Sequence, residues 1–306
     1  MSLLDVLRST VNTLVVPTVL LTAFACQGYA SVAHWASWLL GLGAYVAFVY
    51  LTGDWFLVGY YLRFALLAVY AIATAVSTIG LQALPLTLPF ELRHLVGILL
   101  LALFAPLAII AMKGRRCPGE AVKAIFPLSG GIYCIAAGGS NALLNHHYPA
   151  RYARFALDIV KLNRYGFRAY GFYPRDLTKY LSYGEPVTSP VEGTIVKVID
   201  GIPDSVPPHQ DTENPAGNYV MIKHHSTGAL VLLAHLQQGS LLVHEGQLVY
   251  PRQAIGRVGN SGLSTEPHLH VSCEVDEIQE YNLDGEGLPL LLDGKFLYRN
   301  NLMRSQ

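Results

Sequence analysis

Charged residues are scarce in the first third of this chain of 306 residues. Up to Met112, the acidic and basic residues are Asp5, Arg8, Asp54, Arg63, Glu91 and Arg93. Soluble domains carry a charge on about a quarter of their residues. This scarcity excludes an ordinary soluble domain for the first third, whereas the sequence after Lys113 has ordinary polarity.

Other features are also missing, and each absence excludes a class of protein or site. The formal net charge is zero and there is no tract rich in Lys and Arg, so no nucleic-acid partner is indicated. The four cysteines are scattered without a CxxC pair, which argues against a thiolate zinc site and a disulfide framework. No HExxH motif is present, so a helical metalloprotease site with a glutamate base is excluded.

Apolar residues, by contrast, form four long runs in the first third, at 13–33, 35–52, 55–79 and 95–112. A helix needs about 20 residues to cross the apolar core of a bilayer. We therefore expect about four transmembrane helices in a membrane domain at 1–117, with membrane lipid as a partner, and a second domain at 118–306. The first run continues into further spans, so we expect no cleavable signal peptide.

Beyond Pro118 the sequence has the signals of a β-rich domain. Short runs of β-branched and aromatic residues alternate with Gly, Pro and Asn. These runs predict strands at 131–136, 155–160, 193–199, 219–223, 230–236, 256–258 and 268–275. Two longer segments without helical periodicity, 161–183 and 201–217, are expected to form loops over the rim of this domain.

One short motif, Glu266-Pro267-His268-Leu269-His270, has the spacing of a metal or acid–base site. Side chains alternate between the two faces of a strand, so His268 and His270 point the same way. Pro267 restricts the backbone immediately before the first histidine. The pair alone fits an edge strand that happens to carry two histidines equally well, so the rest of the chain decides.

Ordered sequence blocks around this motif resemble the M23 (LytM-type) zinc endopeptidase family. The blocks are YGEPVTSPVEGTIV at 183–196, GNYVMI at 217–222, LAHL at 233–236, GQLV at 246–249, IGRVGNSG at 255–262 and PHLH at 267–270. The resemblance implies an antiparallel β-sheet or sandwich of the LytM, duplicated hybrid motif-like, type. The expected fold class is thus an N-terminal α-helical membrane domain followed by an all-β domain. The resemblance also implies a Zn2+ cofactor and hydrolysis of the peptide cross-links of cell-wall peptidoglycan.

The resemblance further implies roles for individual residues. The last histidine of the HxH motif binds zinc in this family, which assigns His270 to the metal. The first histidine of that motif, His268, and the histidine of the AHL-type strand, His235, become the catalytic pair. Asp158 is the matching metal-binding aspartate.

The first metal-binding motif of the family, HxxxD, is altered in this chain. Arg154 stands four residues before Asp158, and a guanidinium group stays protonated and cannot bind a cation. Upstream, the segment Asn-His-His-Tyr at 145–148 resembles an N-x-H-Y segment in a membrane-linked branch of the family. We infer that His147, or less favourably His146, supplies the third ligand.

Asp158 needs a partner because it stands in an apolar run at 155–160. The candidates are a metal ion or an ion pair with Arg151 or Arg154. The alternative function is a zinc-free LytM-like binding or regulatory module of the cell envelope, which the altered first motif supports. Four retained polar groups favour the enzyme. A carrier domain of related β architecture ranks last, because no lysine occupies a lipoyl-type turn.

The charges near the membrane boundaries conflict with this function. Peptidoglycan lies outside the cytoplasmic membrane, so its hydrolysis predicts an exterior β domain. Arg8 and the basic cluster at 113–116 fall on one face if the number of spans is even, and positive charge favours the cytoplasmic face. We expect an integral protein of the bacterial cytoplasmic membrane with its peptidase domain on the exterior, periplasmic side.

Overall fold

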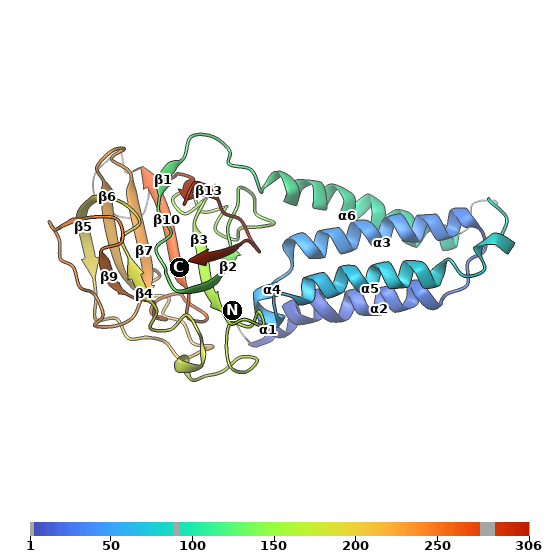
Figure 1. Ribbon diagram of the computed structural model, residues 1–306, viewed down its shortest axis with the longest axis horizontal. Helices are drawn as coiled ribbons and strands as arrows, with labels where there is room; N and C mark the ends of the chain where they lie inside the picture. The colour runs from blue at the N-terminus through green and yellow to red at the C-terminus, as the bar shows by residue number, and fades with distance from the viewer. Residues whose placement is uncertain (1–2, 88–91, 276–284, 306) are drawn as a thin grey trace. The chain divides into compact units, whose positions relative to one another are not determined.

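A computed structural model describes residues 3–87, 92–275 and 285–305 of the chain. The chain divides into two compact units. One is an α-helical unit, Val6–Lys113, and the other is a β-rich unit, Gly114–Gln306, with which Met1–Asp5 is grouped (Figure 1). The change from helices to strands therefore falls where the composition changes.

The helical unit has its helices on the apolar runs of the sequence, except that the first helical stretch, Leu4–Cys26, begins and ends earlier than the run expected at 13–33. Its helices are α1 Leu3–Thr10, α2 Val16–Cys26, α3 Val32–Thr52, α4 Trp55–Val58, α5 Leu62–Ser77 and α6 Leu95–Lys113, with shorter turns η1 Val11–Val15, η2 Leu81–Ala83 and η3 Leu92–His94. Within the described residues, three stretches are long and apolar enough to cross a membrane, namely Leu4–Cys26, Val32–Thr52 and Leu95–Lys113. Helices α3 and α6 approach closely at two glycines, because a Cβ on Gly41 would lie 2.1 Å from the carbonyl oxygen of Gly97.

The run expected as one span at 55–79 forms two helices instead. Helix α4 ends at Gly59, whose φ of +120° is a conformation that glycine adopts far more readily than other residues. Helix α5 then begins, and at 16 residues it is shorter than a full span. Near its start, the buried guanidinium of Arg63 lies 4.0 Å from the centroid of the Tyr50 ring and donates a hydrogen bond to the Tyr50 carbonyl. The charge expected to need a partner has one within the helical unit.

The β-rich unit is built on a large antiparallel sheet. Among the described residues its strand order is β14-β2-β3-β10-β7-β6-β5-β8, with β11 paired to β10 (Figure 1). The bounds are β2 Gly131–Ala137, β3 Leu157–Leu162, β5 Gly193–Ile199, β6 Asn218–His224, β7 Leu230–Leu236, β8 Leu248–Val249, β10 Leu269–Val275, β11 Glu286–Gly287 and β14 Leu302–Ser305. Two small sheets join β4 Pro186–Thr188 to β9 Ala254–Arg257, and β1 Val122–Ala124 to β12 Leu290–Leu292 and β13 Lys295–Phe296. All seven predicted strands are present, with small shifts at their ends.

Strand alternation gives the large sheet a core face and a second face. Leu157 and Ile159 of β3 and Leu269 of β10 belong to the main buried apolar cluster. Asp158 and His270 are the next residues along the same strands, so they face the other side. Burial of apolar surface contributes about 25 cal/mol per Å2 to the free energy of folding. A shift of one residue in strand pairing would lose this contribution, because it would turn the apolar side chains out of the core. The core thus fixes the register of the strands that carry the candidate site.

The two segments expected to be loops are largely irregular. Residues 161 and 162 of the first segment belong to β3. The rest of it, 163–183, contains a short 3-10 turn, η4 Leu177–Lys179, and an isolated bridge between Ala169 and Tyr180. The segment at 201–217 is tied to the turn at 259–262 by a bridge between Asp204 and Ser261. Both are therefore held by defined backbone contacts.

Candidate metal centre

A buried carboxylate stands at the centre of the site. Asp158 on β3 lies directly opposite His270 on β10 in the antiparallel register. Nδ1 of His270 is 3.1 Å from Oδ1 of Asp158, and both residues are buried. A bulge in the pairing of β2 with β3 brings Ala137 opposite Asp158, and such bulges often lie beside active sites. Strand pairing alone therefore brings these two predicted residues together.

His147 reaches the same carboxylate from the loop between β2 and β3. Its Nε2 lies 2.9 Å from Oδ2 of Asp158. The loop is shaped by the fully buried Asn145, whose Oδ1 accepts a hydrogen bond from the backbone N–H of His147. The side-chain amide of Asn145 also donates to the carbonyls of Gly139, Arg154 and Ala156. His147 was predicted as a ligand from the N-x-H-Y segment. The role of Asn145 was not predicted, although Asn145 is the first residue of that segment.

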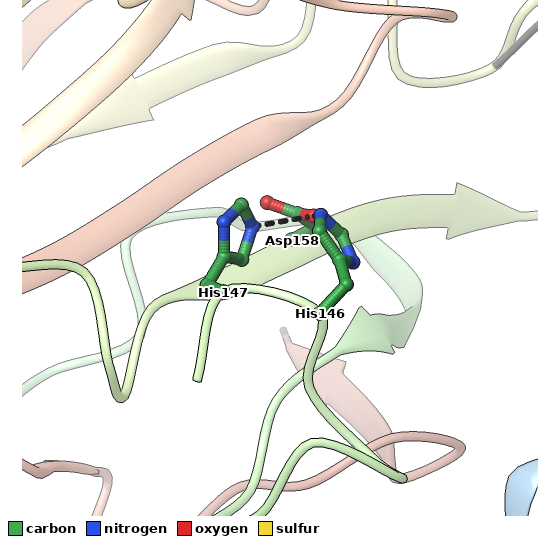
Figure 2. Close-up of side chains that lie close together, drawn as sticks. All are labelled: His146, His147 and Asp158. Carbon is green, nitrogen blue, oxygen red and sulfur yellow. Dashed lines mark hydrogen bonds and ion pairs between the residues drawn. The ribbon is translucent and has the colours of Figure 1, made fainter. Parts of the chain in front are cut away.

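His146, the alternative ligand, points toward the same carboxylate but is far more exposed. Its Nε2 is 3.5 Å from Oδ2 of Asp158, and its side chain is 62% exposed against 19% for His147. Figure 2 shows the two imidazoles, carried by one loop, on either side of Asp158. The three side chains lie close enough together to hold a metal ion. Distance and burial both favour His147.

His268 lies immediately before β10 and presents one ring nitrogen to the site. Its Nδ1 is 2.8 Å from the carbonyl oxygen of Glu266, and its Nε2 is 3.4 Å from Oδ1 of Asp158. A carbonyl oxygen can only accept, so the proton sits on Nδ1. In the neutral ring Nε2 then carries the lone pair and faces the site. His268 and His270 share a face, as the HxH spacing predicts.

His235 joins the site through an irregular backbone. With regular alternation His235 would share the core face with Leu233 of β7, which belongs to the main apolar cluster. Its φ of +59° and a register shift between β6 and β7 turn the side chain away. The His235 ring lies 4.8 Å from that of His268 and 5.7 Å from that of His270, between ring centroids. Strained conformations of this kind cluster at functional sites.

The turn at 259–262 holds the His235 ring. Nδ1 of His235 donates to the carbonyl oxygen of Ser261 at 2.9 Å, which leaves Nε2 as the acceptor in the neutral ring. The turn packs against Gly217, where φ is +60° and an added Cβ would lie 2.5 Å from the Ser261 backbone. Two sequence blocks that contain none of the predicted site residues therefore hold one of them, His235, in place.

Burial and neighbouring charges move the pKa values of these groups in different directions. Burial, together with the facing imidazoles of His268 and His270, holds the pKa of His235 well below its usual value. Burial also opposes the charged form of His268, but the Asp158 carboxylate beside it outweighs burial and raises the pKa. Burial likewise opposes ionisation of Asp158, but His147 and His268 hold its pKa well below the usual range. The site thus pairs one histidine that resists a proton with one that retains it.

The donor set fits a zinc ion. Catalytic zinc sites have three protein ligands drawn from imidazole nitrogens and carboxylate oxygens. Among the described residues, Asp158 makes its ion pairs with histidines, namely His146, His147, His268 and His270. The alternative partners of the carboxylate are engaged elsewhere, since Arg151 pairs with Glu286 and Arg154 lies over the ring of Tyr148.

Comparison with known proteins gives a family for part of the chain. The model of Peptidase family M23 matches residues 178–282. An uncharacterized metalloprotease of Haemophilus influenzae is 35% identical over 96 residues, which are 31% of this chain and 17% of that protein. The peptidoglycan DD-endopeptidase ShyA of Vibrio cholerae is 46% identical over 55 residues, 18% of this chain and 12% of that protein. The chain therefore spans less than a fifth of either relative.

Solved structures match parts of this chain at low identity. The catalytic domain of lysostaphin from Staphylococcus simulans is 22% identical, with 39% of this chain and 84% of that chain covered and a TM-score of 0.25. A putative peptidase M23 from Pseudomonas aeruginosa is 19% identical, with 55% and 53% covered and a TM-score of 0.29. His235, His268 and His270 lie inside the segment matched by the family model, whereas His147 and Asp158 precede it. The resemblance inferred from the sequence is thus confirmed: residues 178–282 of this chain match peptidase family M23.

Proposed function

We propose that this chain is a membrane-anchored zinc endopeptidase that cleaves peptide bonds of cell-wall peptidoglycan. The observation that carries the proposal is the convergence of His147, Asp158, His235, His268 and His270 at one place. The names of the two relatives, a metalloprotease and a peptidoglycan DD-endopeptidase, support the reaction and the substrate class.

His147, Asp158 and His270 would hold the metal. A zinc ion bound there would polarise the scissile carbonyl and lower the pKa of water. Asp158 presents one oxygen to His147 and the other to His270, so the carboxylate holds both imidazoles in place. Because the three residues come from one loop and two adjacent strands, pairing of the strands would hold two of the ligands in place without the metal.

His235 and His268 would carry the acid–base work. Each ring has its Nδ1–H bound to a backbone carbonyl, so each has Nε2 available toward the site. A ring of this kind can take a proton from the nucleophilic water. Once protonated at Nε2, it can hydrogen-bond the developing oxyanion or pass the proton to the leaving amine. Both rings face the same place, 4.8 Å apart between ring centroids, so either could take the proton of the water and return it to the leaving group.

The inactive binding module is not favoured, because it has no need of two oriented catalytic rings beside a donor set. Membrane anchoring is supported by the three apolar helices that are long enough to span a bilayer. We propose that the β-rich unit faces the exterior, where its substrate lies.

Incubation of the purified full-length protein in detergent with purified peptidoglycan sacculi tests the function. Wild type should release soluble peptide-bearing fragments with new free amino groups, and His270→Ala should release none. A matched control is His244→Ala, because His244 is exposed and lies outside the site. Equal release by wild type and His270→Ala would overturn the proposal.

A further inference from the structure

A buried ion pair links the loop segment at 163–183 to the chain just before the HxH motif. Nε of Arg168 lies 2.7 Å from one oxygen of the Glu266 carboxylate and 2.8 Å from the other. The two side chains are only 4% and 5% exposed. Removing one partner of such a pair leaves a buried charge and is strongly destabilising. A buried pair is weak evidence for stability as such, so its position in the fold needs another reason.

The loop segment holds Arg168 firmly and makes a second contact with the same stretch of chain. The carbonyl oxygen of Arg168 accepts from the backbone N–H of Leu181, and its guanidinium donates to the carbonyl of Phe172. The Tyr173 hydroxyl donates to the carbonyl of Thr265. Thr265 and Glu266 are therefore both tied to the loop segment.

Glu266 is also the residue that holds the His268 ring. Its side chain meets Arg168, while its backbone carbonyl accepts the Nδ1–H of His268 at 2.8 Å. Pro267 stands between them, and its fixed φ leaves fewer freely rotating backbone bonds between Glu266 and His268. Displacement of the Glu266 side chain therefore moves the carbonyl that selects which nitrogen of His268 carries the proton.

We propose that Arg168 is a positioning residue for His268, acting through Glu266. The guanidinium fixes Glu266, the Glu266 carbonyl keeps the proton of His268 on Nδ1, and Nε2 is thereby directed at the reacting position. The inference rests on the proposed function for the role of His268, but the orientation of the ring can be measured without any activity. The segment at 163–183 is thus part of the machinery although it contributes no ligand.

The test uses full-length protein with 15N-labelled histidine and compares wild type, Glu266→Gln and Arg168→Met. Glu266→Gln keeps the shape of the side chain and removes its charge, so it serves if Arg168→Met does not fold. The control is Lys161→Met, which breaks the ion pair of Lys161 with Glu185 at the base of the same segment. The His268 signals are identified by their loss in His268→Gln.

At a pH high enough for the ring to be neutral, we expect wild type and Lys161→Met to show one His268 tautomer, protonated at Nδ1. Arg168→Met and Glu266→Gln should show a mixture of tautomers. On cross-linked muropeptides their kcat should fall about tenfold to a hundredfold with KM and zinc content unchanged, and Arg168→Lys should recover part of the loss. Unchanged His268 signals in both variants would overturn the inference, even if their melting temperatures fall. An inactive wild type would instead count against the proposed function, while the NMR comparison would still decide the inference.

Discussion

His270 and Asp158 face each other across two adjacent antiparallel strands, with Nδ1 of the imidazole 3.1 Å from Oδ1 of the carboxylate. The sheet sets this distance, because neither residue can shift without breaking strand register. His147 meets the same carboxylate from a loop. In the candidate centre, Asp158 and His270 are therefore held by strands, whereas His147 is held by a loop. We expect different responses to mutation at the strand positions and at the loop position.

Replacing His147 by Ala should abolish zinc binding, since the two remaining ligands form an incomplete set. The fold should survive because His147 lies in a loop and contributes nothing to the apolar core. Zinc per protein, measured by atomic emission after gel filtration, should fall from about one to near zero. His146→Ala is the matched control and should keep its zinc. Loss of zinc in His146→Ala with retention in His147→Ala would reverse the assignment.

Substitution of either proposed catalytic histidine, His235 or His268, should lower activity without lowering zinc binding. His268→Ala and His235→Asn should each lower kcat about a hundredfold to ten-thousandfold, the usual contribution of general acid–base catalysis. Asn is chosen at position 235 because it tolerates the left-handed backbone found there. Zinc content should equal that of wild type in both variants. Loss of zinc together with activity would make that histidine a ligand and not an acid–base group.

Metal removal should destabilise the β-rich unit. The imidazoles and the carboxylate of the centre are gathered only in the folded chain, so zinc binds the folded state and shifts the folding equilibrium. At a free zinc concentration about a hundred times the dissociation constant, the gain is about 2.7 kcal/mol. Melting temperatures with zinc and after dialysis against a chelator should differ by several degrees, and zinc should restore the loss. Asp158→Asn should show no such difference, and an equal shift in that variant would argue against a metal at Asp158.

One buried and one half-buried tyrosine in the segment at 163–183, Tyr180 and Tyr173, predict a loss of stability in alkali. Burial and the nearby Glu266 carboxylate raise the pKa of Tyr180 above its usual 10.0 and that of Tyr173 to about 12. Below pH 10 both states keep these protons. Above it the unfolded chain releases them while the folded chain retains them, so stability falls as pH rises. Between pH 9 and 11.5, the melting temperature of Tyr180→Phe should fall less steeply than that of wild type. Tyr165→Phe, at a residue 60% exposed, should follow wild type, and equal slopes in all three proteins would refute the prediction.

Protease access in intact spheroplasts tests the side on which the β-rich unit lies. An exterior unit should be degraded by added protease without lysis, leaving the apolar helices protected. A cytoplasmic maltose-binding fusion or similar internal marker serves as the control for lysis. Complete protection of the β-rich unit would contradict the cell-wall substrate and agree with the basic cluster at 113–116.

Strand alternation explains why much of the sheet and the HxH end of the site could be predicted from the sequence. In β10, Leu269, Val271 and Cys273 alternate with polar residues and face the core. His270 therefore belongs to the opposite, polar face of that strand. The position of His235 could not be obtained in this way, because its ring reaches the site only through a positive φ that breaks the alternation. Because few non-glycine residues adopt a positive φ, the presence of a histidine at position 235 does not indicate one.

Long-range contacts account for the remaining differences. Nothing near Arg168 in the sequence indicates that it meets Glu266, 98 residues away. The break in the apolar run at 55–79 depends on Gly59, one of many glycines in the chain, most of which break no helix. Tertiary packing determines both features, and the local sequence propensities do not report tertiary packing.

The fully buried Asn145 has a consequence for detecting related sequences. A search pattern that requires a histidine four residues before the aspartate finds Arg154 here and rejects the chain. The amide of Asn145 ties its loop to three backbone carbonyls. In this loop His147, eleven residues before Asp158, lies with its Nε2 2.9 Å from the Asp158 carboxylate. A pattern that asks for Asn-x-His followed by an aspartate eleven positions after the histidine would recover chains of this kind. The asparagine belongs in that pattern because it fixes the loop that carries the histidine.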